Sequence, residues 1–193
     1  MKQLDLRSPF VLDTRDLGRA PGASQRLTRT VPAPADLGTE VVGVPEGSDL
    51  QLELLLESVM EGVLVSGTVR GRTAGECVRC LDAVDRELDV RFQELFAFSG
   101  KSSAEDEDVH ELSGDHLDLE PVLRDAVVPS LPFQPVCRED CPGLCSECGV
   151  HLADHPDHQH EDVDPRWAAL RDLTENQTET QNVRPDGPTD PRS

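Results

Sequence analysis

Six cysteines are the residues of this chain whose type and spacing could do chemistry. Four lie in the thirteen residues from Cys137 to Gly149, in the pattern C-x3-C-x3-C-x2-C, and the other two form the C-x2-C pair Cys77 and Cys80. A C-x2-C turn directs two sulfurs toward one ion, and a following glycine lets backbone N–H groups approach those sulfurs. The two C-x2-C pairs therefore predict a zinc site rather than a few buried thiols that act as small hydrophobic residues.

The spacing leaves two sets of four ligands open. The local set, which we favour because it needs no long-range fold, is Cys137, Cys141, Cys145 and Cys148. The alternative set, two facing knuckles as in zinc ribbons, is Cys77, Cys80, Cys145 and Cys148. Histidines after Gly149 could substitute for a thiolate, but they have no fixed helical spacing. Four thiolates leave no open position for water on the metal, so the expected role of the zinc is structural.

No motif for catalysis accompanies the cysteines. The chain has no H-E-x-x-H, no phosphate-binding glycine-rich loop and no recognisable Ser-His-Asp context. The carboxylates of Glu105–Asp108 follow one another within the polar stretch 99–116, which we interpret as a solvated acidic loop and not as a buried acid-base pair. We therefore expect no enzyme and no small-molecule substrate.

Three alternating segments must position the cysteines. Apolar residues recur at every second position in 50–56, 63–69 and 85–97, which predicts an antiparallel sheet with one buried face. Cys77 and Cys80 lie in the connection before the third strand. From Leu119 to Val127 the apolar period changes to that of a helix, with Pro121 in its first turn. The predicted class is α+β, with one amphipathic helix covering a small sheet and a cysteine-rich, zinc-knuckle-like loop after it.

The two ends of the chain differ in composition from the middle. Residues 1–35 carry six basic and three acidic side chains, and we interpret them as an edge strand in 3–13 followed by an extended arm in 17–35. The candidate partner-binding residues within residues 1–35 are Arg15, Arg19, Arg26 and Arg29. Residues 36–173 are predicted to form a single α+β domain that ends in a short helix at 165–173. We interpret the polar residues 174–193 as a disordered tail.

The net charge of −20 over 193 residues argues against a general nucleic-acid binder, which needs a cationic surface. A basic protein is the more favourable partner, and the arm is the segment that could contact RNA. Residues 1–15 lack the apolar core of a secretory signal, and no apolar run approaches the length of a membrane span. A cytoplasmic location is expected, where thiols stay reduced and available to a metal.

Three pieces of the sequence together resemble the YceD family, named for accumulation of the large-subunit ribosomal RNA. They are G-E-C-V-R-C-L at 75–81, E-L-F-A-F at 94–98 and L-D-L-E-P-V-L-R-D-A-V-V at 117–128. The segment C-x3-C-P-G-L-C-x2-C-G is similar to the cysteine-bearing form of that family. The resemblance implies a non-enzymatic factor in large-subunit biogenesis that supports 23S rRNA synthesis or processing through a ribosomal protein, rRNA or pre-ribosome. The alternative is a redox- or zinc-responsive regulator, in which oxidation of the thiols releases the metal.

Overall fold

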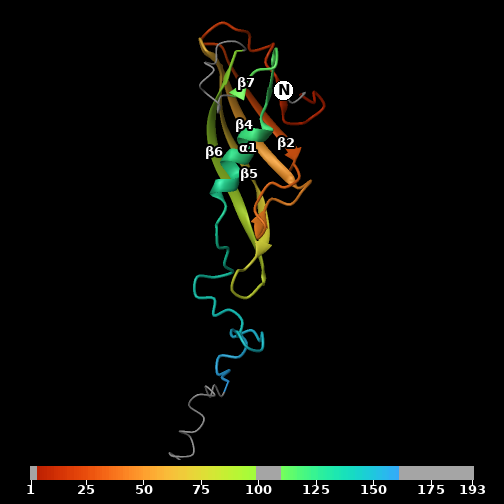
Figure 1. Cartoon of the computed structure of the whole chain (residues 1–193). Coiled ribbons are helices and arrows are strands. Elements are labelled where there is room, and N and C mark those ends of the chain that lie inside the picture. Colours follow the sequence, from red (N-terminus) through yellow and green to blue (C-terminus); the bar gives the residue numbers. More distant parts are fainter. Residues whose placement is uncertain (1–3, 99–109, 161–193) are drawn as a thin grey trace, which may run out of the picture. The chain divides into compact units, whose positions relative to one another are not determined.

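The computed structural model describes residues 4–98 and 110–160 (Figure 1). The chain divides into two units, residues 1–154 and 155–193, and every described helix and strand lies in the first. No described helix is long and apolar enough to cross a membrane. The acidic run 105–108, the expected helix at 165–173 and the expected tail at 174–193 lie outside the described residues.

Three long strands form the body of the first unit, as the alternating pattern predicts. They are β4 (Asp49–Ser58), β5 (Gly62–Glu76) and β6 (Ala83–Ala97), paired in the order β4-β5-β6. The even-numbered leucines of β4 are at most 3% exposed, because alternation places them all on one face of the sheet. Two short strands extend the sheet beyond this prediction. β3 (Val42–Gly43) pairs with β5, and β7 (His110–Glu111) pairs in parallel with β6.

The expectation of an extended arm over residues 17–35 is corrected by β2 (Ser24–Pro32), which forms one edge of the sheet by pairing with β4 along its whole length. Only Leu27 and Val31 of β2 pack with the core, so the strand has too few apolar positions to show a clear alternation. The edge strand expected in 3–13 is shorter and lies elsewhere. It is β1 (Val11–Asp13), which pairs with β8 (His116–Asp118) in a separate two-stranded sheet.

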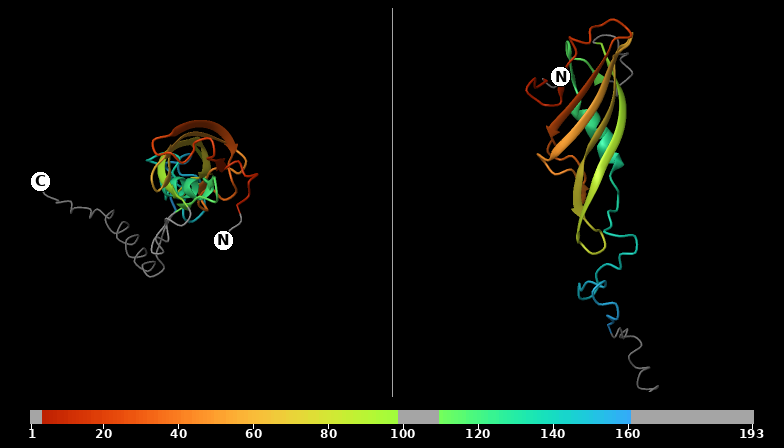
Figure 2. Two further views of the ribbon diagram at one scale, coloured as in Figure 1. Left: turned by 90° about the horizontal axis from the view of Figure 1, so that it is seen from above. Right: turned by 180° about the vertical axis from the view of Figure 1, so that it is seen from behind.

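The predicted helix is α1 (Glu120–Ser130), and it covers the apolar face of the sheet. Its buried residues Val122, Leu123 and Val127 join the core formed by the strands. Figure 2 shows the strands curving around this helix. Asp118 accepts a hydrogen bond from the Glu120 N–H (3.0 Å), and Pro121 occupies the first turn, where no N–H partner is needed. The α+β class and the covering helix are thus confirmed.

Gly62 permits a close approach of two strands at one end of the sheet. A Cβ added there would lie 2.0 Å from the Phe96 carbonyl oxygen, a backbone atom that side-chain rotation cannot move. We expect Gly62→Ala to lower the free energy of unfolding by about 1–3 kcal/mol in urea denaturation. The control Ser24→Ala, at an exposed position of β2, should change it by less than about 0.5 kcal/mol. Equal stability of the two variants would contradict the strand spacing described here.

Candidate metal centre

The turn between β5 and β6 forms the first half of the candidate metal centre. The Cys77 N–H donates to the Asp82 carbonyl (2.8 Å), and the Leu81 N–H donates to the Cys77 carbonyl (2.9 Å). These two bonds close a knuckle that carries Cys77 and Cys80 on its inner side. Both thiols are buried, and with Val84 and Cys141 they form an apolar cluster separate from the core under α1.

The chain that leaves α1 supplies the second half. It runs along the knuckle, where the Val78 N–H donates to the Pro135 carbonyl (2.9 Å) and Arg86 donates to the Val136 carbonyl (2.8 Å). These bonds hold Cys137 and Cys141 against the first pair. Arg79 also joins the two halves, since its Nη1 donates to the carbonyls of Glu139 (3.1 Å) and Cys141 (3.0 Å).

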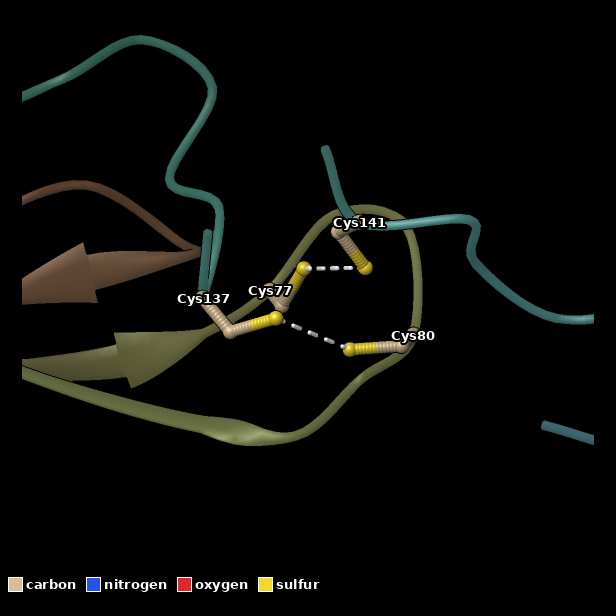
Figure 3. Close-up of side chains that lie close together, drawn as sticks. All are labelled: Cys77, Cys80, Cys137 and Cys141. Carbon is tan, nitrogen blue, oxygen red and sulfur yellow. Dashed lines mark hydrogen bonds between the residues drawn. The ribbon is translucent and has the colours of Figure 1, made fainter. Parts of the chain in front are cut away.

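The four sulfurs of Cys77, Cys80, Cys137 and Cys141 face one another (Figure 3) and lie within 4.8 Å of one another. The Sγ–Sγ distance is 3.9 Å between Cys77 and Cys141 and 3.6 Å between Cys80 and Cys137. Four thiolates around zinc at about 2.3 Å make a tetrahedron with sulfurs about 3.8 Å apart. A disulfide would need about 2.05 Å. The spacing of the sulfurs and the chemistry of the donors therefore suit a tetrahedral ion such as Zn²⁺.

This group of four differs from both predicted ligand sets. It combines Cys137 and Cys141 of the local set with Cys77 and Cys80 of the alternative set, while Cys145 and Cys148 lie outside it. The local set would have left the β5–β6 pair unexplained, and the structure places that pair within the group of four. The sequence places Cys137 and Cys141 soon after the predicted helix, but only the path of the chain shows which other cysteines they meet.

Cys145 and Cys148 lie in a second knuckle with the same hydrogen bonds as the first. The Cys145 N–H donates to the Val150 carbonyl (2.8 Å), and the Gly149 N–H donates to the Cys145 carbonyl (2.9 Å). The second knuckle is connected to the first by the Leu144 N–H, which donates to the Arg79 carbonyl (3.0 Å). It therefore belongs to the same folded end of the first unit.

The thiols of the group differ in acidity because of their hydrogen bonds. Burial alone raises the pKa of Cys77, but N–H groups of Cys137, Arg79 and Cys80 that point at its sulfur outweigh burial and lower that pKa to about 6. A backbone N–H of Asp82 acts in the same direction on Cys80, but there burial and bonds to the Asp82 carboxylate and neighbouring thiols raise the pKa. Desolvation of its sulfur likewise raises the pKa of Cys137, although the residue as a whole is exposed. The hydrogen bonds around the Cys77 sulfur thus favour its thiolate form, which is the form of cysteine that binds a metal.

The four arginines expected to bind a partner fall into two groups. Arg15 is hydrogen-bonded to Asp13 and holds the pKa of that carboxyl at about 2. Arg19 lies 3.0 Å from Asp115 and over the ring of Phe98. Asp residues therefore neutralise these two charges.

Arg26 and Arg29 are exposed on β2, and neither makes an ion pair within residues 4–98 and 110–160. Arg26 lines a shallow hollow on the sheet together with Arg91. Arg26 and Arg29 therefore retain the positive charge that a contact with an acidic partner would need. Partner binding by any of the four arginines stays a prediction.

Arg79 is expected to support metal binding without touching the metal. Replacement by alanine removes both bonds to the loop that carries Cys141, so the two halves of the centre are held less firmly. Loss of such outer contacts typically costs 10–100-fold in metal affinity, and we expect Arg79→Ala to weaken zinc affinity about 10-fold in a competition titration with a chromophoric chelator. The control is Arg138→Ala, whose side chain pairs only with the exposed Asp140 among the described contacts. Unchanged affinity in Arg79→Ala would show that the second half is held by other means.

Comparison with known proteins identifies the family to which the sequence is similar. Residues 65–174 match the family model described as "Large ribosomal RNA subunit accumulation protein YceD". The chain is 45% identical over 181 residues to the uncharacterized protein Rv2926c of Mycobacterium tuberculosis. The aligned region covers 92% of this chain and 87% of that protein. It is 30% identical over 116 residues to YlbN of Bacillus subtilis, covering 58% of this chain and 67% of that protein. No solved structure matches the chain significantly.

Proposed function

Because the chain belongs to the YceD family, we propose that it is a non-enzymatic factor in the biogenesis of the large ribosomal subunit, needed for normal accumulation of 23S rRNA. The observation that carries this proposal is the family match over residues 65–174. That range contains most of β5, all of β6 and α1, and every cysteine of the chain. The protein would act in the cytoplasm, by binding a ribosomal protein or the rRNA of the pre-ribosome.

The proposed cofactor is one structural Zn²⁺ held by Cys77, Cys80, Cys137 and Cys141. The support is the donor chemistry and the sulfur spacing of this group. A four-thiolate ion offers no exchangeable water and so does no hydrolytic chemistry. Its effect would be to join the turn at the end of β5 to the segment after α1, so that both present one fixed surface to a partner.

Deletion of the gene tests the proposal most simply. We expect a lower ratio of free large to small ribosomal subunits in sucrose gradients, with less mature 23S rRNA than 16S rRNA. The wild-type chain should restore the ratio, and a variant with serine at all four clustered cysteines should restore it poorly at matched protein levels. Normal subunit ratios and normal 23S rRNA in the deletion strain would refute the function.

A redox- or zinc-responsive regulator is the second candidate, and the exposure of one thiol favours it. Cys137 is exposed, whereas the other three thiols of the group are buried. Hydrogen peroxide that reaches Cys137 would oxidise it together with Cys80 (3.6 Å away) to a disulfide, while the peroxide is reduced to water and the metal leaves. Release of zinc at near-stoichiometric peroxide, reversed by a thiol reductant, would support this function. Retention of zinc in excess peroxide would exclude it.

A further inference from the structure

The two knuckles of this protein differ at one position that their shared geometry makes comparable. In each, the residue after the second cysteine donates its N–H to the first cysteine and adopts a left-handed backbone, with φ of 72° at Gly149 and 64° at Leu81. Glycine adopts this backbone without steric cost, whereas a residue with a Cβ does so at a cost of about 1 kcal/mol. Leucine therefore stands in the first knuckle where the second knuckle has the residue that suits the turn.

The side chain of Leu81 gains little packing that could offset this strain. It is 60% exposed, so it contributes little to either apolar cluster. Val78 of the same knuckle is 42% exposed, and Val41, before β3, is 41% exposed. All three line one open hollow of about 390 Å³ beside the candidate metal centre. Strained backbone that exposes an apolar side chain is typical of a residue kept for contact with another molecule.

This apolar surface is held rigidly. Val41 is fixed to the end of β5 because its carbonyl accepts the Glu76 N–H (3.1 Å). A Cβ on Gly75 would lie 2.4 Å from the same carbonyl oxygen, so the two segments are in direct backbone contact. Val78 and Leu81 are fixed by the knuckle and by the bond to Pro135 described above. A partner would therefore meet a preformed surface, which lowers the entropic cost of binding.

The charge around the hollow selects the class of partner. Glu40 and Glu76 line it, and Asp36 lines the adjoining hollow of about 450 Å³. Among residues 4–98 and 110–160, no arginine or lysine lines either hollow. None of the three carboxylates makes an ion pair within the described part of the chain. An RNA backbone would be repelled here, whereas a protein segment with lysine or arginine beside an apolar side chain would complement both features.

We propose that Val41, Val78 and Leu81, with the carboxylates of Glu40 and Glu76, form the docking surface for a basic, partly apolar segment of a large-subunit ribosomal protein. This inference rests on the proposed function, which it deepens by choosing a protein over rRNA as the direct partner. The apolar residues would supply the contact area, and the carboxylates would speed association and select a cationic partner.

A photo-crosslinking amino acid at position 81 tests the surface in the full chain. The probes are the purified proteins of the large subunit freed of rRNA, and separately naked 23S rRNA. We expect one basic ribosomal protein to crosslink at position 81. The control position is 60, which also exposes an apolar side chain (Met60, 72%) but lies at the opposite end of β5. Crosslinking to rRNA, to a second copy of the chain, or equally at both positions would overturn the proposal.

Two sets of variants separate docking from folding. Leu81→Gly should keep or raise the unfolding midpoint, because it relieves the left-handed strain, and yet abolish capture of the ribosomal protein. Reversal of charge in the double variant Glu40→Lys, Glu76→Lys should weaken binding about 10-fold or more, whereas the matched variant Glu57→Lys, Glu61→Lys should not. Undiminished binding in Leu81→Gly would refute the surface.

Failure of the surface and failure of the function give different results. If Leu81→Gly restores subunit ratios in the deletion strain as well as wild type does, the surface is wrong and the function stands. If the deletion strain has normal ribosomes while position 81 still crosslinks a ribosomal protein, the surface stands and the function is wrong.

Discussion

Removal of the proposed zinc ion is expected to free residues 133–154 from the end of the sheet while the core beneath α1 stays folded. The cysteine cluster and the main core are separate apolar clusters, so the loss of one does not open the other. Without the ion, the two halves of the centre are joined by a few backbone and arginine hydrogen bonds. Each such bond contributes only about 1 kcal/mol, whereas structural zinc contributes on the order of 10 kcal/mol in small zinc domains.

Hydrogen exchange measures this difference directly. The amides of Val78 and Leu144, which bond across the two halves, should lose most of their protection when a chelator is added, and the amides of β4 should keep theirs. The variant with serine at all four clustered cysteines is the control. Its amide protection should resemble that of the chelator-treated protein and should not change when the chelator is added. Loss of protection throughout the sheet, or no loss anywhere, would contradict the separation of the two clusters.

A large effect of a single substitution on stability is expected at Leu123. Its side chain is fully buried where α1 meets the sheet, so Leu123→Ala leaves a cavity that the rigid strands cannot fill. We expect the free energy of unfolding to fall by about 2–5 kcal/mol in urea denaturation. Asp125→Ala, on the exposed side of the same helix, serves as control and should change it by less than about 0.5 kcal/mol. Similar stability of both variants would mean that α1 does not close the core.

The parts of the fold that sequence could predict are those where burial imposes a period. In β4 a leucine recurs at every second position, and in α1 the buried residues recur at helical spacing. The first pattern therefore predicts a strand and the second a helix. The family resemblance drawn from residues 75–81, 94–98 and 117–128 is likewise confirmed by the match over 65–174.

The parts that sequence could not predict depend on contacts between distant segments. β2 is an edge strand with one neighbour, and the partner that orders it, β4, is separated from it by residues 33–48. The grouping of the cysteines is a similar case. Spacing identifies pairs that can share an ion, but only the path of the chain after α1 determines that Cys137 and Cys141 meet Cys77 and Cys80.

The zinc content of two double variants tests the central claim, that sulfurs from the β5–β6 turn and from the segment after α1 hold one ion. The pairs to compare are Cys137→Ser with Cys141→Ser, and Cys145→Ser with Cys148→Ser. We predict that the first variant binds one ion fewer per chain than wild type, and that the second keeps the absorption spectrum of a four-thiolate site when loaded with cobalt. Zinc content unchanged in the first variant, or a four-thiolate spectrum lost in the second, would contradict the claim.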